Sequence, residues 1–239
     1  MPKASRGSRQ RQSKQVSDGF FVPSKIETLS FVKPANFNQR RYVESLLHNT
    51  VTVASGNAGV GKSLLALHTA TCLINHPNSE IERILYVRAN VGVKDEKDLG
   101  AVPGDVGDKT QTLAYPVWDN LSEFMQQGQI KALFDFGKIQ VMPVALMRGR
   151  SLANTFVIVD EAQNLSPHGI RTVLSRISHG SKIVLMGDNS QADTNKGGHL
   201  NRLCDLLANT DGVGVIRFTL DDIVRHPMLK EILIKIEGL

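Results

Sequence analysis

The sequence has few cysteines, few aromatic residues and no long apolar run. Its two cysteines, Cys72 and Cys204, lie far apart and outside any metal-ligand spacing, so buried free thiols in a reducing cytoplasm are expected. No apolar run approaches the roughly 18 residues that a membrane span needs, and the first residues lack the apolar stretch of a secretory signal. Aromatic residues make up 5%, which gives no sign of a broad base-stacking surface. These absences favour a cytoplasmic protein without a membrane partner.

Positive charge is in excess, with a formal net charge of +5, and much of it lies at the amino terminus. Residues 1–19 hold five Lys and Arg residues among Ser, Gln and Gly, with Asp18 as the single acid. Such a segment cannot bury enough apolar surface to order itself, so 1–19 is predicted to be a disordered basic arm. The arm is either a solubilising tail or a salt-sensitive contact with nucleic-acid phosphates. Residues 20–35, which include Pro23 and Pro34, are expected to be an extended segment.

Residues 36–239 are predicted to form one domain, because no internal repeat or second change of composition follows Asn36. A helix is expected over 36–49, where apolar residues recur at helical spacing. Six β-rich runs follow, separated by helical or loop sequence. They are Val51–Ala54, Ile84–Val87, Ile139–Met142, Phe156–Val159, Ile183–Met186 and Val213–Phe218. Such runs alternating with helices are typical of an α/β fold, with a mostly parallel sheet covered by helices on both faces.

A phosphate-binding loop follows the first of these runs and precedes an apolar helix. Its glycines let backbone N–H groups and the helix amino terminus point at phosphates. Lys62 is predicted to contact the β- and γ-phosphates, and the Ser63 hydroxyl to ligate Mg²⁺. The loop consists of Gly56, Asn57, Ala58, Gly59, Val60, Gly61, Lys62 and Ser63. Strand, complete motif and helix together predict binding of ATP with Mg²⁺.

The run Phe156–Val159 ends in two acids, Asp160 and Glu161. An acid at the carboxyl end of a buried strand lies where open α/β sheets bind their ligands. Asp160 is therefore predicted to hold Mg²⁺ through water. Glu161 is predicted to be the general base that polarises the attacking water.

A third strand end carries Asp188 and Gln191, either of which could orient the attacking water or sense the γ-phosphate. About a hundred residues, with two β-rich runs among them, separate Lys62 from Asp160. This separation predicts that the strands leading to the two motifs are not neighbours in the sheet. That arrangement is typical of RecA-like P-loop hydrolases rather than nucleotide kinases.

With these motifs the chain resembles the PhoH family, whose core is similar to the first RecA-like domain of superfamily 1 helicases. The resemblance runs from about Asn38 to Ile236. It rests on further motifs that occur in the family's order and spacing. They are Val159–Asn164, Leu99–Asp105, Met147–Arg150, Gly187–Gln191 and Asp222–Pro227.

The resemblance implies roles for four further residues. Gln39 aligns with a glutamine that reads the adenine edge in helicase-like relatives, the alternative being a solvated residue early in a helix. Arg225 is the first candidate for contact with the γ-phosphate, and capping the helix that follows it is the alternative. Arg148 and Arg150 are second candidates. They could reach a phosphate of nucleotide or nucleic acid, or form structural salt bridges.

The function predicted from these observations is an ATP hydrolase, with Glu161, Gln191 and Arg225 as catalytic residues. Through the resemblance, hydrolysis is expected to be coupled to RNA or single-stranded DNA, with helicase-like activity as a possibility. The alternative is an ATP-gated module that binds or assembles a protein partner. In superfamily 1 motors a second RecA-like domain supplies an arginine to the ATP site, whereas one such domain is predicted here. A homo-oligomer, a hexameric ring above all, is therefore expected to complete each site.

Overall fold

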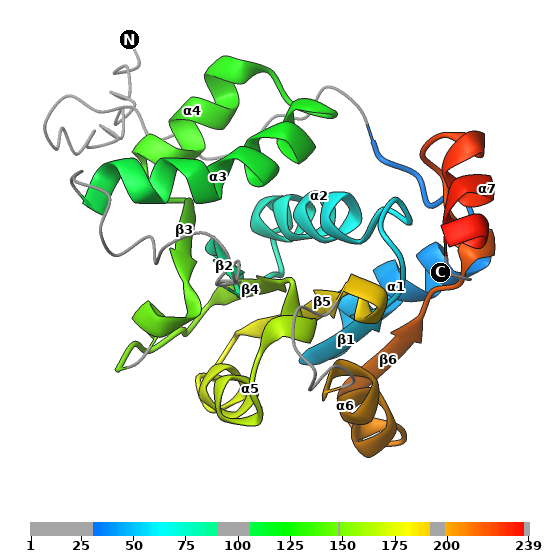
Figure 1. Cartoon of the computed structure of the whole chain (residues 1–239). Coiled ribbons are helices and arrows are strands. Elements are labelled where there is room, and N and C mark those ends of the chain that lie inside the picture. The colour runs from blue at the N-terminus through cyan, green and yellow to red at the C-terminus, as the bar shows by residue number, and fades with distance from the viewer. Residues whose placement is uncertain (1–30, 90–105, 148, 192–198, 237–239) are drawn as a thin grey trace, which may run out of the picture.

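The computed structural model of the chain describes residues 31–89, 106–147, 149–191 and 199–236. Within these residues the chain forms a sheet with helices on both faces (Figure 1). Residues 31–35 form neither helix nor strand. The predicted arm 1–19, residues 20–30 and the motif Leu99–Asp105 lie outside the described residues, and the predicted division of the chain stays a prediction.

Six strands form the sheet in the order β3-β2-β4-β5-β1-β6, and every neighbouring pair is parallel. The strands are β1 (Val51–Ser55), β2 (Arg83–Arg88), β3 (Ile139–Pro143), β4 (Thr155–Asp160), β5 (Lys182–Gly187) and β6 (Val213–Arg217). Each predicted strand is present, with ends that differ by at most one residue. Because both faces of the sheet are covered, the inner strands are buried along almost their whole length.

Helices cover the sheet in two layers (Figure 1). Helices α1, α2, α3 and α4 pack on one face, and α5 and α6 pack on the other. The predicted helices at 36–49 and after the phosphate loop are confirmed as α1 and α2. The helices are α1 (Phe37–His48), α2 (Lys62–Asn75), α3 (Val106–Ser122), α4 (Gln127–Asp135), α5 (Pro167–Leu174), α6 (His199–Leu207) and α7 (Pro227–Ile236).

Two apolar cores lie on opposite faces of the sheet, because successive strand residues point to opposite sides. In β2, Ile84 and Tyr86 belong to the core beneath α2, whereas Leu85 and Val87 belong to the core beneath α5 and α6. The largest side chains of the first core, Tyr42 and Tyr86, have no exposed surface. This packing holds the carboxyl ends of β1, β4 and β5 at one edge of the sheet.

The strand order confirms that the phosphate loop and the acidic pair follow strands that are not neighbours, since β5 lies between β1 and β4. Both cysteines are free thiols, as predicted, but only Cys204 is buried and Cys72 is half-buried. Within the residues described above, no helix is long and apolar enough to cross a membrane.

Candidate nucleotide-binding and hydrolysis site

The phosphate loop joins β1 to α2 through backbone conformations that favour glycine. Gly59 and Gly61 have φ of +87° and +84°, in the left-handed region. A Cβ on Gly56 would lie 2.4 Å from Cβ of Phe218 in the segment after β6, so no side chain fits there. Gly61 precedes α2 and makes no side-chain capping bond. The first N–H groups of α2 are thus available to an anion.

Lys62 lies inside the curve of the loop, with 9% of its surface exposed. Its Nζ donates hydrogen bonds to the carbonyl oxygens of Gly56, at 2.6 Å, and Asn57, at 2.9 Å. Burial lowers the pKa of the Lys62 ammonium, and the carboxylates of Asp188 and Asp160 oppose that shift. The loop therefore holds an ammonium group where a phosphate is predicted to enter.

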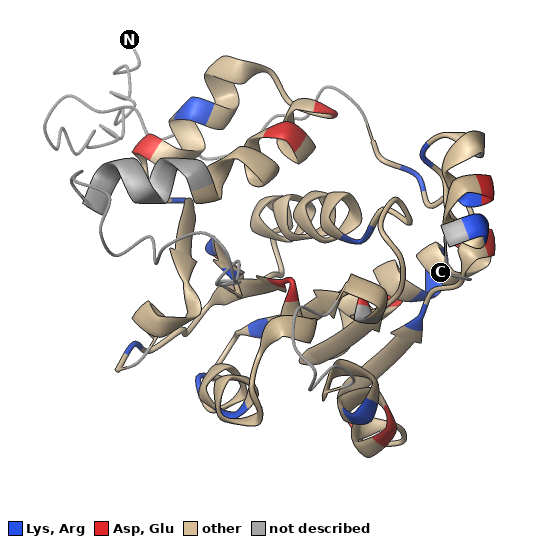
Figure 2. Ribbon diagram, in the orientation of Figure 1, with Lys and Arg blue, Asp and Glu red and all other residues tan. Residues whose placement is uncertain are grey.

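The acidic pair lies at the end of β4, below α2 (Figure 2). Oδ1 of Asp160 accepts a hydrogen bond from the Glu161 N–H at 3.0 Å. Glu161 has φ of +57°, a left-handed conformation that is uncommon for a residue with a side chain and clusters at functional sites. Both carboxylates line one cavity together with Lys62 and Ser63. The structure thus brings together the four residues predicted to act on the phosphates, the metal and the attacking water.

Tyr86 links the two predicted metal ligands, and the sequence analysis missed it. Its side chain is fully buried, and its hydroxyl donates a hydrogen bond to Oδ2 of Asp160. The same hydroxyl also shares a hydrogen bond with Ser63. Burial raises the pKa of the Tyr86 phenol well above its usual value, and the Asp160 charge adds to the shift. Tyr86 therefore stays protonated as a donor to Asp160.

Gln163 is a second residue that the sequence analysis missed. It has 1% of its surface exposed and lies in the 3-10 turn Ala162–Asn164 after β4. Its Nε2 donates to Oε2 of Glu161 at 2.7 Å, and its Oε1 accepts the N–H of Asp188 at 3.1 Å. A Cβ on Gly187 would lie 2.1 Å from Oε1 of Gln163, so the amide needs the glycine beside it. Gln163 fixes the Glu161 carboxylate relative to the end of β5.

The end of β5 is tied to the phosphate loop by Asp188. Oδ2 of Asp188 accepts the N–H of Ala58 at 3.0 Å, while Oδ1 accepts the N–H and hydroxyl of Ser190 at 3.0 and 2.6 Å. Oδ2 therefore holds the phosphate loop, and Oδ1 holds the turn after β5. Gln191 is exposed and lines the cavity, where its predicted role toward the attacking water stays a prediction.

Gln39 is a buried support of the phosphate loop, so the alternative of a solvated glutamine is wrong. It has 3% of its surface exposed. Its Oε1 accepts the N–H of Ala35 at 2.6 Å, and its Nε2 donates to the carbonyl oxygen of Val60 at 2.9 Å. A Cβ on Gly61 would lie 3.1 Å from that Nε2. The amide is thus engaged on both sides, and its predicted reading of adenine stays a prediction.

The predicted arginines lie in different places. Arg225 is exposed and lines the cavity. The alternative that it caps α7 is wrong, because Nδ1 of His226 accepts the N–H of Met228 at 3.2 Å in that position. Arg150 lies outside the cavity, and its described hydrogen bond is to a methionine sulfur rather than to a carboxylate. Arg148 lies outside the described residues.

The cavity between these groups has a volume of about 470 Å³, in the range of small-molecule sites. Ser63 and Asp160 present the oxygen donors that Mg²⁺ prefers, so the site fits the metal. Asn120 of α3 and Glu123, in the turn after α3, also line it, although no sequence motif marked them. The other lining residues are Ala58, Gly59, Gly61, Lys62, Leu64, Glu161, Gly187, Asp188, Gln191, Val224 and Arg225.

Comparison with solved structures agrees with this class of fold. The large terminase of a thermophilic bacteriophage, in complex with ADP, superimposes with a TM-score of 0.50 at 12% identity. The match covers 82% of this chain and 48% of the terminase. The parallel sheet, the phosphate loop and the acidic end of β4 define a P-loop NTPase fold of the RecA-like class.

Sequence comparisons give the family. A family model described as PhoH-like protein matches residues 31–237. A PhoH-like protein of Synechocystis is 37% identical over 214 residues, covering 88% of this chain and 64% of that protein. A PhoH-like protein of Bacillus subtilis is 33% identical over 204 residues, covering 84% and 63%. Protein PhoH of Escherichia coli is 29% identical over 205 residues, covering 83% and 56%.

The chain therefore belongs to the PhoH-like family, as its motifs led us to expect. It spans less than two thirds of the length of each of these three relatives.

Proposed function

We propose that the protein binds ATP with Mg²⁺ in this cavity and hydrolyses the γ-phosphate. The observation that carries the proposal is the placement of four groups around one cavity: the Lys62 ammonium, the Ser63 hydroxyl and the carboxylates of Asp160 and Glu161. Phosphoryl transfer needs a cation on the phosphates, a metal site and a group that orients the nucleophile. Lys62 supplies the cation, Ser63 and Asp160 supply the metal site, and Glu161 orients the nucleophile.

In the proposed reaction the phosphate loop and Lys62 bind the phosphates, and Ser63 and Asp160 hold the metal. When bound, Mg²⁺ neutralises charge that develops on the phosphate oxygens. Glu161 accepts a proton from the attacking water as general base. Because Gln163 donates to only one oxygen of the Glu161 carboxylate, at 2.7 Å, the other oxygen is available to the water. Gln191, which also lines the cavity, is the candidate to orient that water.

We also propose that hydrolysis is coupled to RNA or single-stranded DNA. The support is the net charge of +5 and the basic segment 1–19. Helicase-like movement and a cytoplasmic location stay predictions. The test is the rate of ATP hydrolysis by the full chain with and without RNA and single-stranded DNA at low salt. Stimulation is the expected result. Hydrolysis that neither nucleic acid changes would favour the alternative, an ATP-gated module with a protein partner.

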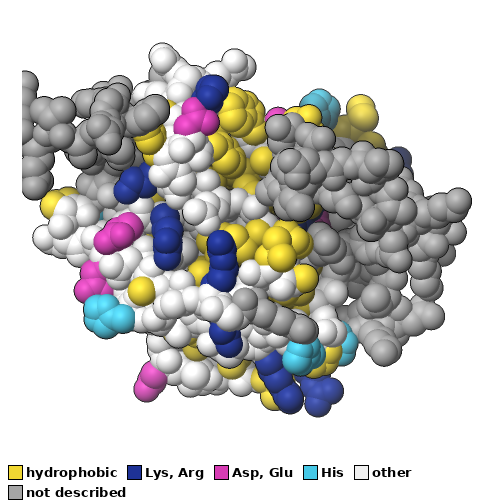
Figure 3. Space-filling model, turned by 90° about the vertical axis from the view of Figure 1, so that its left-hand side faces the viewer, with side chains coloured by type: hydrophobic (Ala, Val, Ile, Leu, Met, Phe, Trp, Pro, Cys, Tyr) yellow, Lys and Arg dark blue, Asp and Glu magenta, His cyan; other side chains and the backbone are white. Residues whose placement is uncertain are grey.

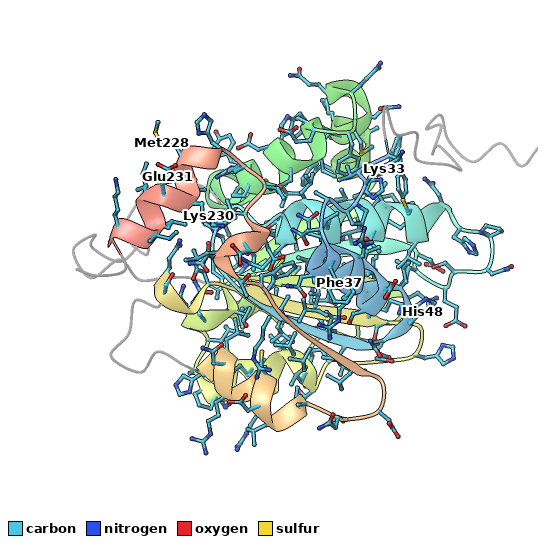
Figure 4. The ribbon with its side chains drawn as sticks, turned by 90° about the vertical axis from the view of Figure 1, so that its right-hand side faces the viewer. Lys33, Phe37, His48, Met228, Lys230 and Glu231 are labelled. Carbon is cyan, nitrogen blue, oxygen red and sulfur yellow. The ribbon has the colours of Figure 1, made fainter. Side chains whose placement is uncertain are left out.

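We further propose that Arg225 acts across a subunit interface in a homo-oligomer, with a hexameric ring as the leading form. Arg225 is exposed at the cavity and has no carboxylate within ion-pair distance among the described residues. Helix α7, which follows it, presents apolar side chains at the surface (Figure 4). Met228, Ile232 and Ile234 are 59%, 46% and 52% exposed. A neighbouring copy that covers α7 would contact Arg225 at the border of that interface.

A further inference from the structure

A second, smaller cavity lies at the amino-terminal ends of the strands, whereas the nucleotide cavity lies at their carboxyl ends. Its volume is about 240 Å³, and it is lined at the start of β2 by Arg83 and at the start of β4 by Thr155. The same two strands end five residues later, at Arg88 and Asp160, on the side of the sheet that holds the nucleotide cavity. At about 3.3 Å per residue, roughly 16 Å separates the two ends of each strand. The smaller cavity is therefore a distinct site.

Two arginines line this cavity, and none of the described residues that line it is acidic. Nε of Arg83 donates to Oγ1 of Thr155 at 2.9 Å. Arg150, from the loop before β4, donates to the sulfur of Met142 at 3.5 Å, and a thioether is a weak acceptor. Within the described part of the chain, neither guanidinium has a carboxylate within ion-pair distance. Each keeps most of its five donors for another partner.

Two like charges that share a cavity repel each other, and an anion between them would remove that repulsion. The planar fork of arginine matches the oxygens of a phosphate group. Gln140 and Ser151 add neutral hydrogen-bonding groups to the wall. At about 240 Å³ the cavity is half the size of the nucleotide site and below the usual range for small-molecule sites. It suits one phosphate group rather than a second nucleotide.

The surface around this cavity favours a polymer of phosphates. The loop that carries Arg150 lies on the side of the molecule that faces the viewer in Figure 3. On that face, Lys and Arg side chains follow one another across the middle and lower part, and the acidic side chains lie mainly to one side (Figure 3). A free phosphate ion would contact the two arginines alone. A nucleic-acid backbone would also meet other cations on this face.

We propose that the Arg83–Arg150 cavity binds a backbone phosphate of a single-stranded nucleic acid. This inference rests on the proposed coupling of hydrolysis to nucleic acid, and it names a surface through which the nucleic acid binds. Because the cavity and the nucleotide site lie at opposite ends of the same strands, β2 and β4 connect them directly.

The test compares two double variants of the full chain, Arg83→Gln with Arg150→Gln, and Arg40→Gln with Arg202→Gln. Arg40 and Arg202 are exposed residues of α1 and α6, so the second pair removes the same charge elsewhere on the surface. Binding of a labelled oligouridylate and a labelled oligothymidylate is followed by fluorescence anisotropy over a series of salt concentrations. Melting temperatures of the variants control for folding.

For a single strand, loss of one phosphate contact lowers the slope of log affinity against log salt by about 0.7. The Arg83/Arg150 variant should show this loss and weaker binding at low salt, and the control pair should stay close to the parent. Equal behaviour of the two double variants would overturn the proposed site while leaving nucleic-acid coupling intact. A parent protein that binds neither oligonucleotide would overturn the coupling, and the site with it.

Discussion

Removal of the Tyr86 hydroxyl tests how the metal site is held. The hydroxyl bonds both Ser63 and Asp160 from a fully buried position, so Tyr86→Phe deletes one oxygen and leaves the ring packing in place. Loss of a partner that orients metal ligands typically weakens metal binding by about 10- to 100-fold. We therefore expect Mn²⁺, used in place of Mg²⁺, to bind the ADP complex more weakly by that factor, which is about 1.4–2.7 kcal/mol.

The assay is a titration of the ADP complex with Mn²⁺, followed by electron paramagnetic resonance. ADP affinity without metal should change little, because Tyr86 does not line the cavity. Tyr42→Phe is the matched control: its hydroxyl is equally buried, but it donates to the sulfur of Met186 at 3.7 Å. If Mn²⁺ binds the two variants equally well, or binds Tyr86→Phe more tightly than the parent, Tyr86 does not position the metal ligands.

Four further outcomes are expected. Lys62→Ala should weaken ATP binding by about 10- to 100-fold, measured by calorimetry, because hydrogen bonds to charged groups contribute roughly 1.5–3 kcal/mol each. Gln39→Ala should weaken GTP as well as ATP through the loop; reading of adenine would add a loss specific to ATP, and equal losses would remove that role. Mixing Glu161→Gln with Arg225→Ala should restore hydrolysis if Arg225 acts in trans, since an arginine finger contributes about 10³–10⁵ in rate; no recovery despite subunit exchange would reject it. Deleting 1–19 should lower the salt dependence of RNA binding, whereas unchanged affinity at every ionic strength would make the arm a solubility tail.

The strands and the two main motifs could be predicted because their signals are local in sequence. A run such as Val157-Ile158-Val159 is apolar since both faces of β4 are covered, and this pattern alone identifies a buried parallel strand. The phosphate loop needs its glycines for reasons that lie within the loop or against one neighbour. Gly61, at φ of +84°, is an example. Such requirements leave a readable pattern.

The supporting residues could not be predicted, because their roles depend on pairing between distant segments. Tyr86 reads as one more strand residue until β2 pairs with β4 and places it opposite Ile158, two residues before Asp160. Gln163 lies two residues after Glu161, but its bond to Asp188 exists only because β4 and β5 are neighbours.

For Gln39 the resemblance implied contact with the base, and the helix pattern gave no sign that its amide is buried against the phosphate loop.

The most direct test of the proposed function is the release of phosphate from ATP and Mg²⁺ by the full chain and by Glu161→Gln, with nucleic acid present and absent. The parent should hydrolyse ATP. Glu161→Gln should bind ATP as tightly as the parent and turn over about 10²- to 10⁴-fold more slowly, because it has lost a positioned general base. Equal turnover by the two proteins at saturating ATP, or no hydrolysis by the parent under any of these conditions, would contradict the assignment of this cavity as an ATP hydrolysis site.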